Sequence, residues 1–206
     1  MDSQTRRKYA SLMWECRYRI ETVRDFVEGK THCTYLQTTI ESEALQLRKL
    51  LELIAFASLV SYQDAYRSVR NDIARDWHAA RILKKIEGIN PNFYPTPVRG
   101  HDGKRWRKLS GGHLTRHQFS QLYDKCGDML HTKNPFSKGK SSLAFHNQVP
   151  EYLRRIELLL SEHYVRLANT NELIHVTAPM NPESSIQVRV FVELESSFKK
   201  SRKADA

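Results

Sequence analysis

Cysteine is scarce in this chain, and long apolar runs are absent. The three cysteines, Cys16, Cys33 and Cys126, are odd in number and far apart, which favours free thiols in a reducing cytoplasm over a disulfide framework. The longest apolar stretch, residues 50–60, is interrupted by Glu52 and is much shorter than the roughly 20 residues that a membrane-spanning helix needs. No apolar segment follows the first basic residues, so no signal peptide is visible. We therefore expect a cytoplasmic protein with no membrane association.

Recognisable metal and nucleotide motifs are missing as well. The sequence contains no Cys-x-x-Cys or His-Glu-x-x-His motif. His113 and His117 have helical i, i+4 spacing, but His113 precedes the helix start expected at Thr115, so the two rings need not share a face. The glycine pair after Ser110 is too short for a phosphate-cradling loop. We expect no metal site and no cofactor.

Acidic residues are rare in one part of the chain, residues 99–140. This segment holds ten lysines and arginines against three aspartates, so it carries a net +7 of the whole chain's +10. Charge this uneven indicates a surface that meets a polyanion, because phosphate contacts release condensed counterions. A solvated basic loop without a partner is the alternative. Nucleic acid is the partner class that the charge favours, with RNA preferred to DNA.

The basic segment overlaps a region rich in proline and glycine, residues 90–114. Three prolines and four glycines interrupt every helical or strand period there, which predicts an irregular basic loop. Trp106 stands among basic residues in this loop, and its ring can either stack on a base or pin the loop to the body of the protein. The predicted nucleic-acid-binding residues are Arg99, Lys104, Arg105, Trp106, Arg107, Lys108, Arg116, Lys125 and Lys133.

Apolar residues recur every three or four positions over much of the chain, which is typical of amphipathic helices. Thr115 and Gln118 have the spacing of a capping box, which predicts the start of one helix. Pro150 is favourable in the first turn of another helix. The stretch around residues 50–60 is apolar nearly all round, so its helix should be central and the most buried. The pattern predicts a mainly α protein, a bundle of about five helices, over residues 7–27, 39–61, 71 or 72–88, 115–131 and 150–167.

Near the C-terminal end the period changes from that of a helix to that of a strand. Apolar and polar residues alternate from Ile186 to Leu194, and residues 173–178 can pair with this strand as a β-hairpin. A lone hairpin is marginal in water, so it must pack on the helices or on a second chain. We therefore expect a helical domain over residues 1–168, a β-hairpin appendage over 169–197 and a disordered tail over 198–206.

His131 is the strongest candidate for chemistry. It follows the apolar face of the helix that ends there and precedes a turn, where a histidine can exchange a proton near neutral pH. A cap of the helix end is the structural alternative. Arg48 and Glu52 stand at i, i+4 on the apolar central helix, and they either orient His131 or form a structural ion pair.

The order of these helices resembles the HEPN superfamily: a long central helix, then a later helix that ends in a histidine and a turn. The resemblance covers residues 39–168 by helix order and His131 by motif. In that family's ribonuclease motif four to six residues separate an arginine from the histidine. In this chain Cys126 lies four intervening residues before His131, and Lys125 lies five before it. No arginine lies at a spacing of four, five or six. The resemblance implies a small helical domain, commonly dimeric, of the kind found in bacterial toxins, phage defence and RNA processing.

We predict from these features a nucleic-acid-associated, HEPN-like protein in prokaryotic defence or mobile-element biology, acting as a homodimer or in a hetero-complex. The missing arginine favours binding over cleavage. Two alternatives stay open. One is a ribonuclease with His131 as general acid or base, in which Lys125 or an arginine of the basic loop replaces the family arginine. The other is a protein-interaction subunit that uses the strand edge and the first helix.

Overall fold

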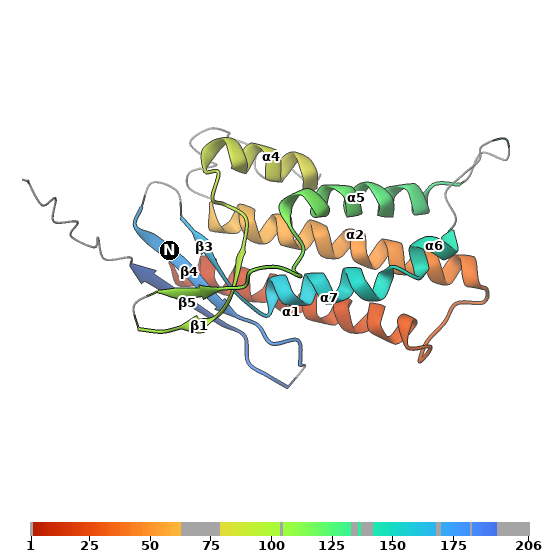
Figure 1. Cartoon of the computed structure of the whole chain (residues 1–206), viewed down its shortest axis with the longest axis horizontal. Helices are drawn as coiled ribbons and strands as arrows, with labels where there is room; N and C mark the ends of the chain where they lie inside the picture. The colour runs from red at the N-terminus through yellow and green to blue at the C-terminus, as the bar shows by residue number, and fades with distance from the viewer. Residues whose placement is uncertain are drawn as a thin grey trace, which may run out of the picture.

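Two long helices form the centre of the fold. The computed structural model describes residues 2–62, 79–103, 105–132, 136, 142–167, 170–181 and 183–192. Helix α1 (Ser3–Val27) begins where the Asp2 carboxylate accepts a hydrogen bond from the Thr5 amide, and helix α2 (Leu36–Ser61) packs along it (Figure 1). The second helix was expected to start at Thr39, which instead lies one turn inside it, where its hydroxyl accepts from the Cys33 amide.

Most of the remaining helices pack on α2, in agreement with its predicted central position. They are α4 (Ala79–Ile89), α5 (Arg116–Leu130), α6 (Ser142–His146) and α7 (Val149–Leu160). Helices α4, α5 and α6 contact α2, and α7 contacts α1. The capping box at the start of α5 is confirmed, since the Thr115 and Gln118 side chains each accept from the other's amide. The start of the helix predicted from residue 71 or 72 lies outside the described residues.

A five-stranded antiparallel sheet replaces the single hairpin of the prediction. Its strand order is β2-β1-β3-β4-β5, with β1 (Thr96–His101), β2 (Trp106–Lys108), β3 (Glu162–Arg166), β4 (Glu172–Thr177) and β5 (Gln187–Val192). The β4–β5 hairpin is confirmed, but it continues into three further strands. The fold is therefore mixed α/β rather than mainly α.

Strands β1 and β2 lie inside the segment predicted to be an irregular loop. They form a hairpin whose turn contains Gly103 at φ 91°, a left-handed conformation that favours glycine. The register shifts between Val98 and His101, so the side chains of β1 do not alternate regularly along the sequence. Because of this irregularity and of Pro97 in the strand, the sequence of β1 shows no apolar–polar alternation from which the hairpin could have been predicted.

The helix predicted to run to residue 167 ends at Leu160, and the chain continues at once into β3. The Leu160 carbonyl, which a longer helix would use internally, is bonded to His163 Nδ1 at 3.0 Å. Leu160, Tyr164 and Leu167 have helical spacing, which misled the sequence analysis. Because His163, Tyr164 and Val165 are all buried, this central strand has no polar face to reveal its period of two.

The sheet lies at one end of the helices, with one face against α1 (Figure 1). His163 and Val165 of β3 and Ile174 and Val176 of β4 face this way, and Tyr9 of α1 hydrogen-bonds His163. The opposite, outer face has a small apolar cluster of its own, Val98, Tyr164 and Leu173, against which Trp106 packs. No helix among the described residues is long and apolar enough to cross a membrane. The predicted disordered tail, residues 198–206, lies outside the described residues.

Candidate functional site

The basic side chains of the β1–β2 hairpin project into solvent. Arg99, Arg105, Arg107 and Lys108 are all exposed, and the Arg105 side chain is 87% exposed. Within the described ranges Arg105 alone has a carboxylate nearby, Asp102 at 3.8 Å. A pair this exposed contributes little, so the hairpin presents cations that are largely uncompensated. Lys104 lies outside the described residues.

Beside these cations, each of the five strands contributes one ring to an outer-face aromatic cluster. Trp106 of β2 is at its centre, with ring-centroid distances of 4.4 Å to His175 of β4, 4.8 Å to His101 of β1, 5.4 Å to Phe191 of β5 and 6.0 Å to Tyr164 of β3. Trp106 thus anchors β2 to the sheet. Its ring is only partly buried, and Phe191 keeps 40% of its surface exposed.

A carboxylate links the hairpin to the middle of the sheet beneath the aromatic cluster. Glu162 accepts from the Gly100 amide at 3.1 Å through one oxygen, and its other oxygen lies 3.0 Å from His175 Nε2. His175 is 7% exposed, so its orientation is fixed by Glu162 on one side and Trp106 on the other. Rings held in place by such contacts suit stacking, because ordering them on binding costs little conformational entropy.

His131 lies at the end of α5, whereas the Arg48–Glu52 pair belongs to α2 and contacts α5 at Tyr123. His131 is exposed, and its extended backbone (φ −89°, ψ 137°) ends the helix. Arg48 is 3.6 Å from Glu52, donates to the Tyr123 hydroxyl at 2.9 Å and lies 4.1 Å from the Tyr123 ring centroid. A Cβ at Gly127 would lie 3.0 Å from Arg48 Nη1, so a larger residue there would require the guanidinium group to shift. No described contact joins His131 to Arg48 or Glu52.

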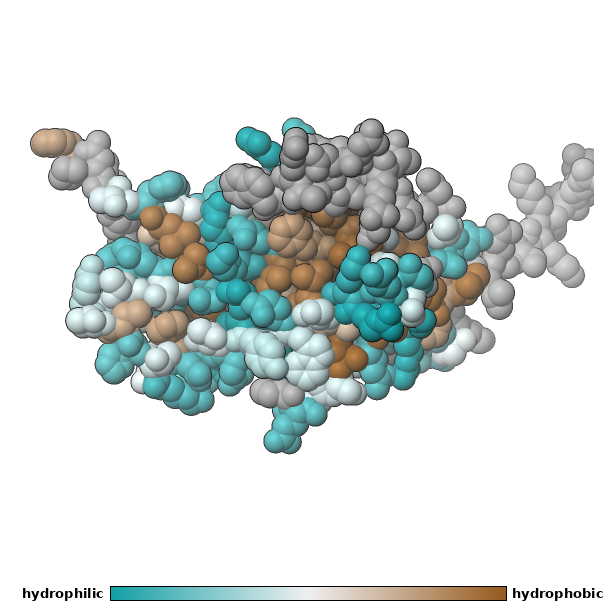
Figure 2. All heavy atoms as spheres, turned by 180° about the vertical axis from the view of Figure 1, so that it is seen from behind, coloured by the Kyte–Doolittle hydropathy of each residue, from teal (hydrophilic) through white to brown (hydrophobic). Residues whose placement is uncertain are grey.

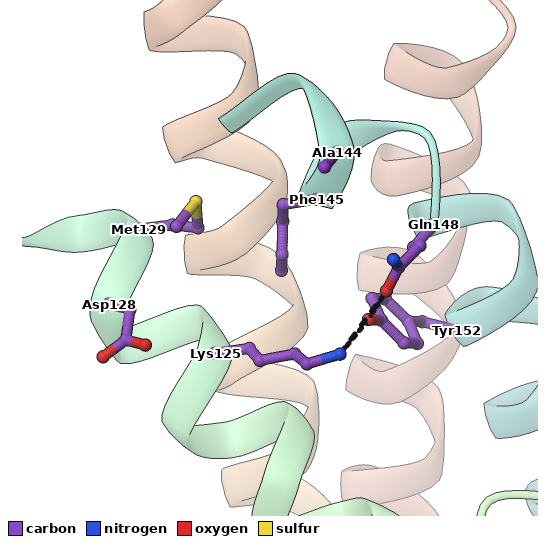
Figure 3. Close-up of a pocket in the computed structure, with 7 residues that line it drawn as sticks. All are labelled: Lys125, Asp128, Met129, Ala144, Phe145, Gln148 and Tyr152. Atoms are coloured by element: carbon purple, nitrogen blue, oxygen red, sulfur yellow. Dashed lines mark hydrogen bonds between the residues drawn. The ribbon is translucent and has the colours of Figure 1, made fainter. Parts of the chain in front are cut away.

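Two other predicted nucleic-acid-binding residues belong to the helices rather than to the hairpin. Arg116 donates to the Ser120 hydroxyl at 2.6 Å and lies 3.9 Å from Glu87 of α4. Lys125 reaches from α5 toward Gln148 and Tyr152 at the start of α7 (Figure 3). Lys133 lies outside the described residues. The structure therefore divides the basic residues between two separate surfaces.

Two histidines that the sequence analysis did not single out have the most specific surroundings. His163 is fully buried, and its Nε2 lies 2.8 Å from the Tyr9 hydroxyl while Nδ1 lies 3.0 Å from the Leu160 carbonyl. Desolvation lowers the pKa of His163 to about 4, so the ring is neutral. His146 of α6 lies 2.9 Å from Glu43 of α2, a carboxylate with no exposed surface whose pKa is raised by burial and lowered in part by His146.

The described side chains include no group of three or more histidine, cysteine or acidic residues placed to hold a metal ion. His113 is partly buried and His117 is exposed. No protein-family model matches the chain, and no curated protein or solved structure matches it significantly. The HEPN resemblance stays a hypothesis that depends on helix order and on His131.

Proposed function

We propose that this protein binds single-stranded RNA on the outer face of its sheet. The observation that carries the proposal is the combination of uncompensated cations on the β1–β2 hairpin with an aromatic cluster beside them. Aromatic rings stack on bases of any sequence, while arginine and lysine hold the phosphates between them. Stacking requires unpaired bases, so the surface suits a single strand better than a duplex.

The electrostatic part is tested by measuring RNA affinity as a function of salt. Replacing Arg105, Arg107 and Lys108 with alanine should flatten the log–log salt dependence by about 2, since each phosphate contact to a single strand contributes about 0.7. Alanine at Arg6, Arg7 and Lys8, three exposed basic residues near the start of α1, removes the same charge elsewhere and is the matched control. Equal slopes for the two triple variants would contradict the assignment of the surface.

The stacking part is tested at Phe191. Its replacement by alanine should weaken binding of a short single-stranded RNA about tenfold or more, because a base stacked on an aromatic ring contributes about 1–3 kcal/mol. Val192→Ala changes the next, still more exposed side chain and should leave the affinity unchanged. Binding of duplex RNA should be insensitive to both variants. A Phe191→Ala protein with full affinity for the single strand would argue against stacking.

The proposal does not need His131, which lies at the end of α5 among the helices. His131→Ala should therefore leave the RNA affinity unchanged. Its melting temperature should stay within a few degrees of the wild type, since exposed substitutions usually change stability by about 0.5 kcal/mol or less. The same variant tests the ribonuclease alternative. RNA cleavage by the wild-type protein that disappears in His131→Ala would favour that alternative over binding alone.

A further inference from the structure

A cavity of about 300 Å³ lies between α5, α6 and α7. Figure 3 shows its walls: Lys125 and Met129 come from α5, Ala144 and Phe145 from α6, and Tyr152 from α7. Helix α6 is at the end of the helices away from the sheet, so this cavity is separate from the proposed RNA surface (Figure 1). Its size is at the lower limit of small-molecule sites.

Lys125 brings a positive charge to the cavity, and its described hydrogen-bond partners are neutral. Its ammonium donates to the Tyr152 hydroxyl at 2.8 Å and to Gln148 Oε1 at 3.4 Å, and both acceptors are neutral. Across the described ranges no carboxylate lies within salt-bridge distance of it, whereas Arg155 of α7 pairs with Glu151 at 2.6 Å. An ammonium has three donors, so one remains for a ligand.

The other end of the cavity is apolar. Met129 and Phe145 face each other there, with Ala144 at the rim (Figure 3). Asp128 also lines the cavity, but its carboxylate points away from Lys125 (Figure 3). A ligand that fills this space therefore meets a cation at one end and thioether and phenyl groups at the other.

We propose that this cavity binds a small organic anion with an apolar body, such as a medium-chain carboxylate. The carboxylate accepts from the free donor of Lys125, and the apolar chain displaces water from between Met129 and Phe145. Charge attraction and burial of apolar surface act at opposite ends, so neither an anion nor an apolar molecule alone satisfies the site.

The test uses octanoate, with octanol and acetate as probes of each half of the ligand. The chain has four methionines, so the methyl resonance of Met129 can be assigned with Met129→Leu and followed by NMR during titration. Octanoate should shift it saturably, while octanol and acetate should bind about tenfold or more weakly, because a hydrogen bond to a charged group contributes about 1.5–3 kcal/mol. Octanol that binds as tightly as octanoate would overturn the proposal.

Two variants locate the binding. Lys125→Met removes the charge but keeps an unbranched side chain of similar length, and it should reduce octanoate affinity to that of octanol. Lys49→Met, at an exposed lysine of α2, should leave the affinity unchanged. Ala144→Phe adds a ring at the exposed rim and should block the cavity while the buried core is unaltered. Full octanoate affinity in either Lys125→Met or Ala144→Phe would overturn the proposal, and RNA binding should be the same in all three proteins.

Discussion

At the residue scale, the burial of acidic side chains on α2 differs from what the local sequence suggests. Glu43 lies near the start of α2 and is fully buried, because it is on the same face of the helix as Ile40 and Leu47. Glu52, which was expected in the most buried part of that helix, is only partly buried and pairs with Arg48. Glu43 follows Ile40 by three residues and precedes Leu47 by four, and this helical spacing was the available sign that Glu43 faces the core.

His163 should make the protein sensitive to acid. Its folded pKa of about 4 is below the ordinary value of 6.5, so the unfolded chain takes up a proton first as the pH falls. Stability from this group is therefore complete above pH 6.5 and is lost as the pH falls toward 4, with a maximum loss of about 3 kcal/mol. The measurement is the free energy of unfolding between pH 7 and 4 by urea denaturation.

His163→Gln removes the titrating ring, so the loss over this pH range should be smaller by most of that amount. His117→Gln changes an exposed histidine and serves as the control, with a pH profile like that of the wild type. Parallel profiles for His163→Gln and the wild type would show that another group causes the acid sensitivity.

At the scale of elements, the sequence predicted most of what local patterns specify. Helices α1, α2, α5 and the start of α7, together with the β4–β5 hairpin, follow from apolar periodicity and capping residues. Three strands were missed, and only the pairing of β1 with β3 joins segments that are distant in the sequence. β1 lies in an irregular register beside prolines and glycines, and β3 is buried on both faces, so neither shows an alternating pattern.

The capping box of α5 offers a direct measure of one local signal. Thr115→Ala removes the hydroxyl that accepts from the Gln118 amide and should cost about 1 kcal/mol of stability. Thr115→Ser keeps the hydroxyl and should cost much less. Thermal denaturation of the two variants beside the wild type checks the difference, and equal costs would mean that the cap does not stabilise α5.

At the scale of the whole molecule, the candidate site was predicted in part. Sequence identified the basic hairpin residues, but it could not separate them from Arg116 and Lys125, because only the fold places these on the helices. Nor could it show that strands distant in the chain each bring a ring to Trp106. The face opposite to that in Figure 1 has hydrophobic residues in its middle among hydrophilic ones (Figure 2).

We expect the chain to pair with a second copy through β5. This strand is at the edge of the sheet, and Phe191 and Val192 are 40% and 64% exposed on it. An exposed apolar edge strand is a template for pairing unless charge protects it. Sedimentation at tens of micromolar should show a dimer that Val192→Lys weakens and Val192→Thr preserves. A strict monomer in the wild-type protein would contradict this expectation.

The adjacency of β1 and β3 has a consequence for the order in which the chain can fold. Helices α5, α6 and α7 all lie between these two strands in the sequence. β3, β4 and β5 follow one another in the sequence and can pair through short connections. Pairing of β1 with β3 requires closure of a long intervening segment, which is entropically costly. On a ribosome, the β1–β2 hairpin therefore emerges well before the strand that holds it in place. We therefore expect the complete sheet to assemble late, and a chain truncated before β3 would contain the basic hairpin sequence without the strand that β1 pairs with.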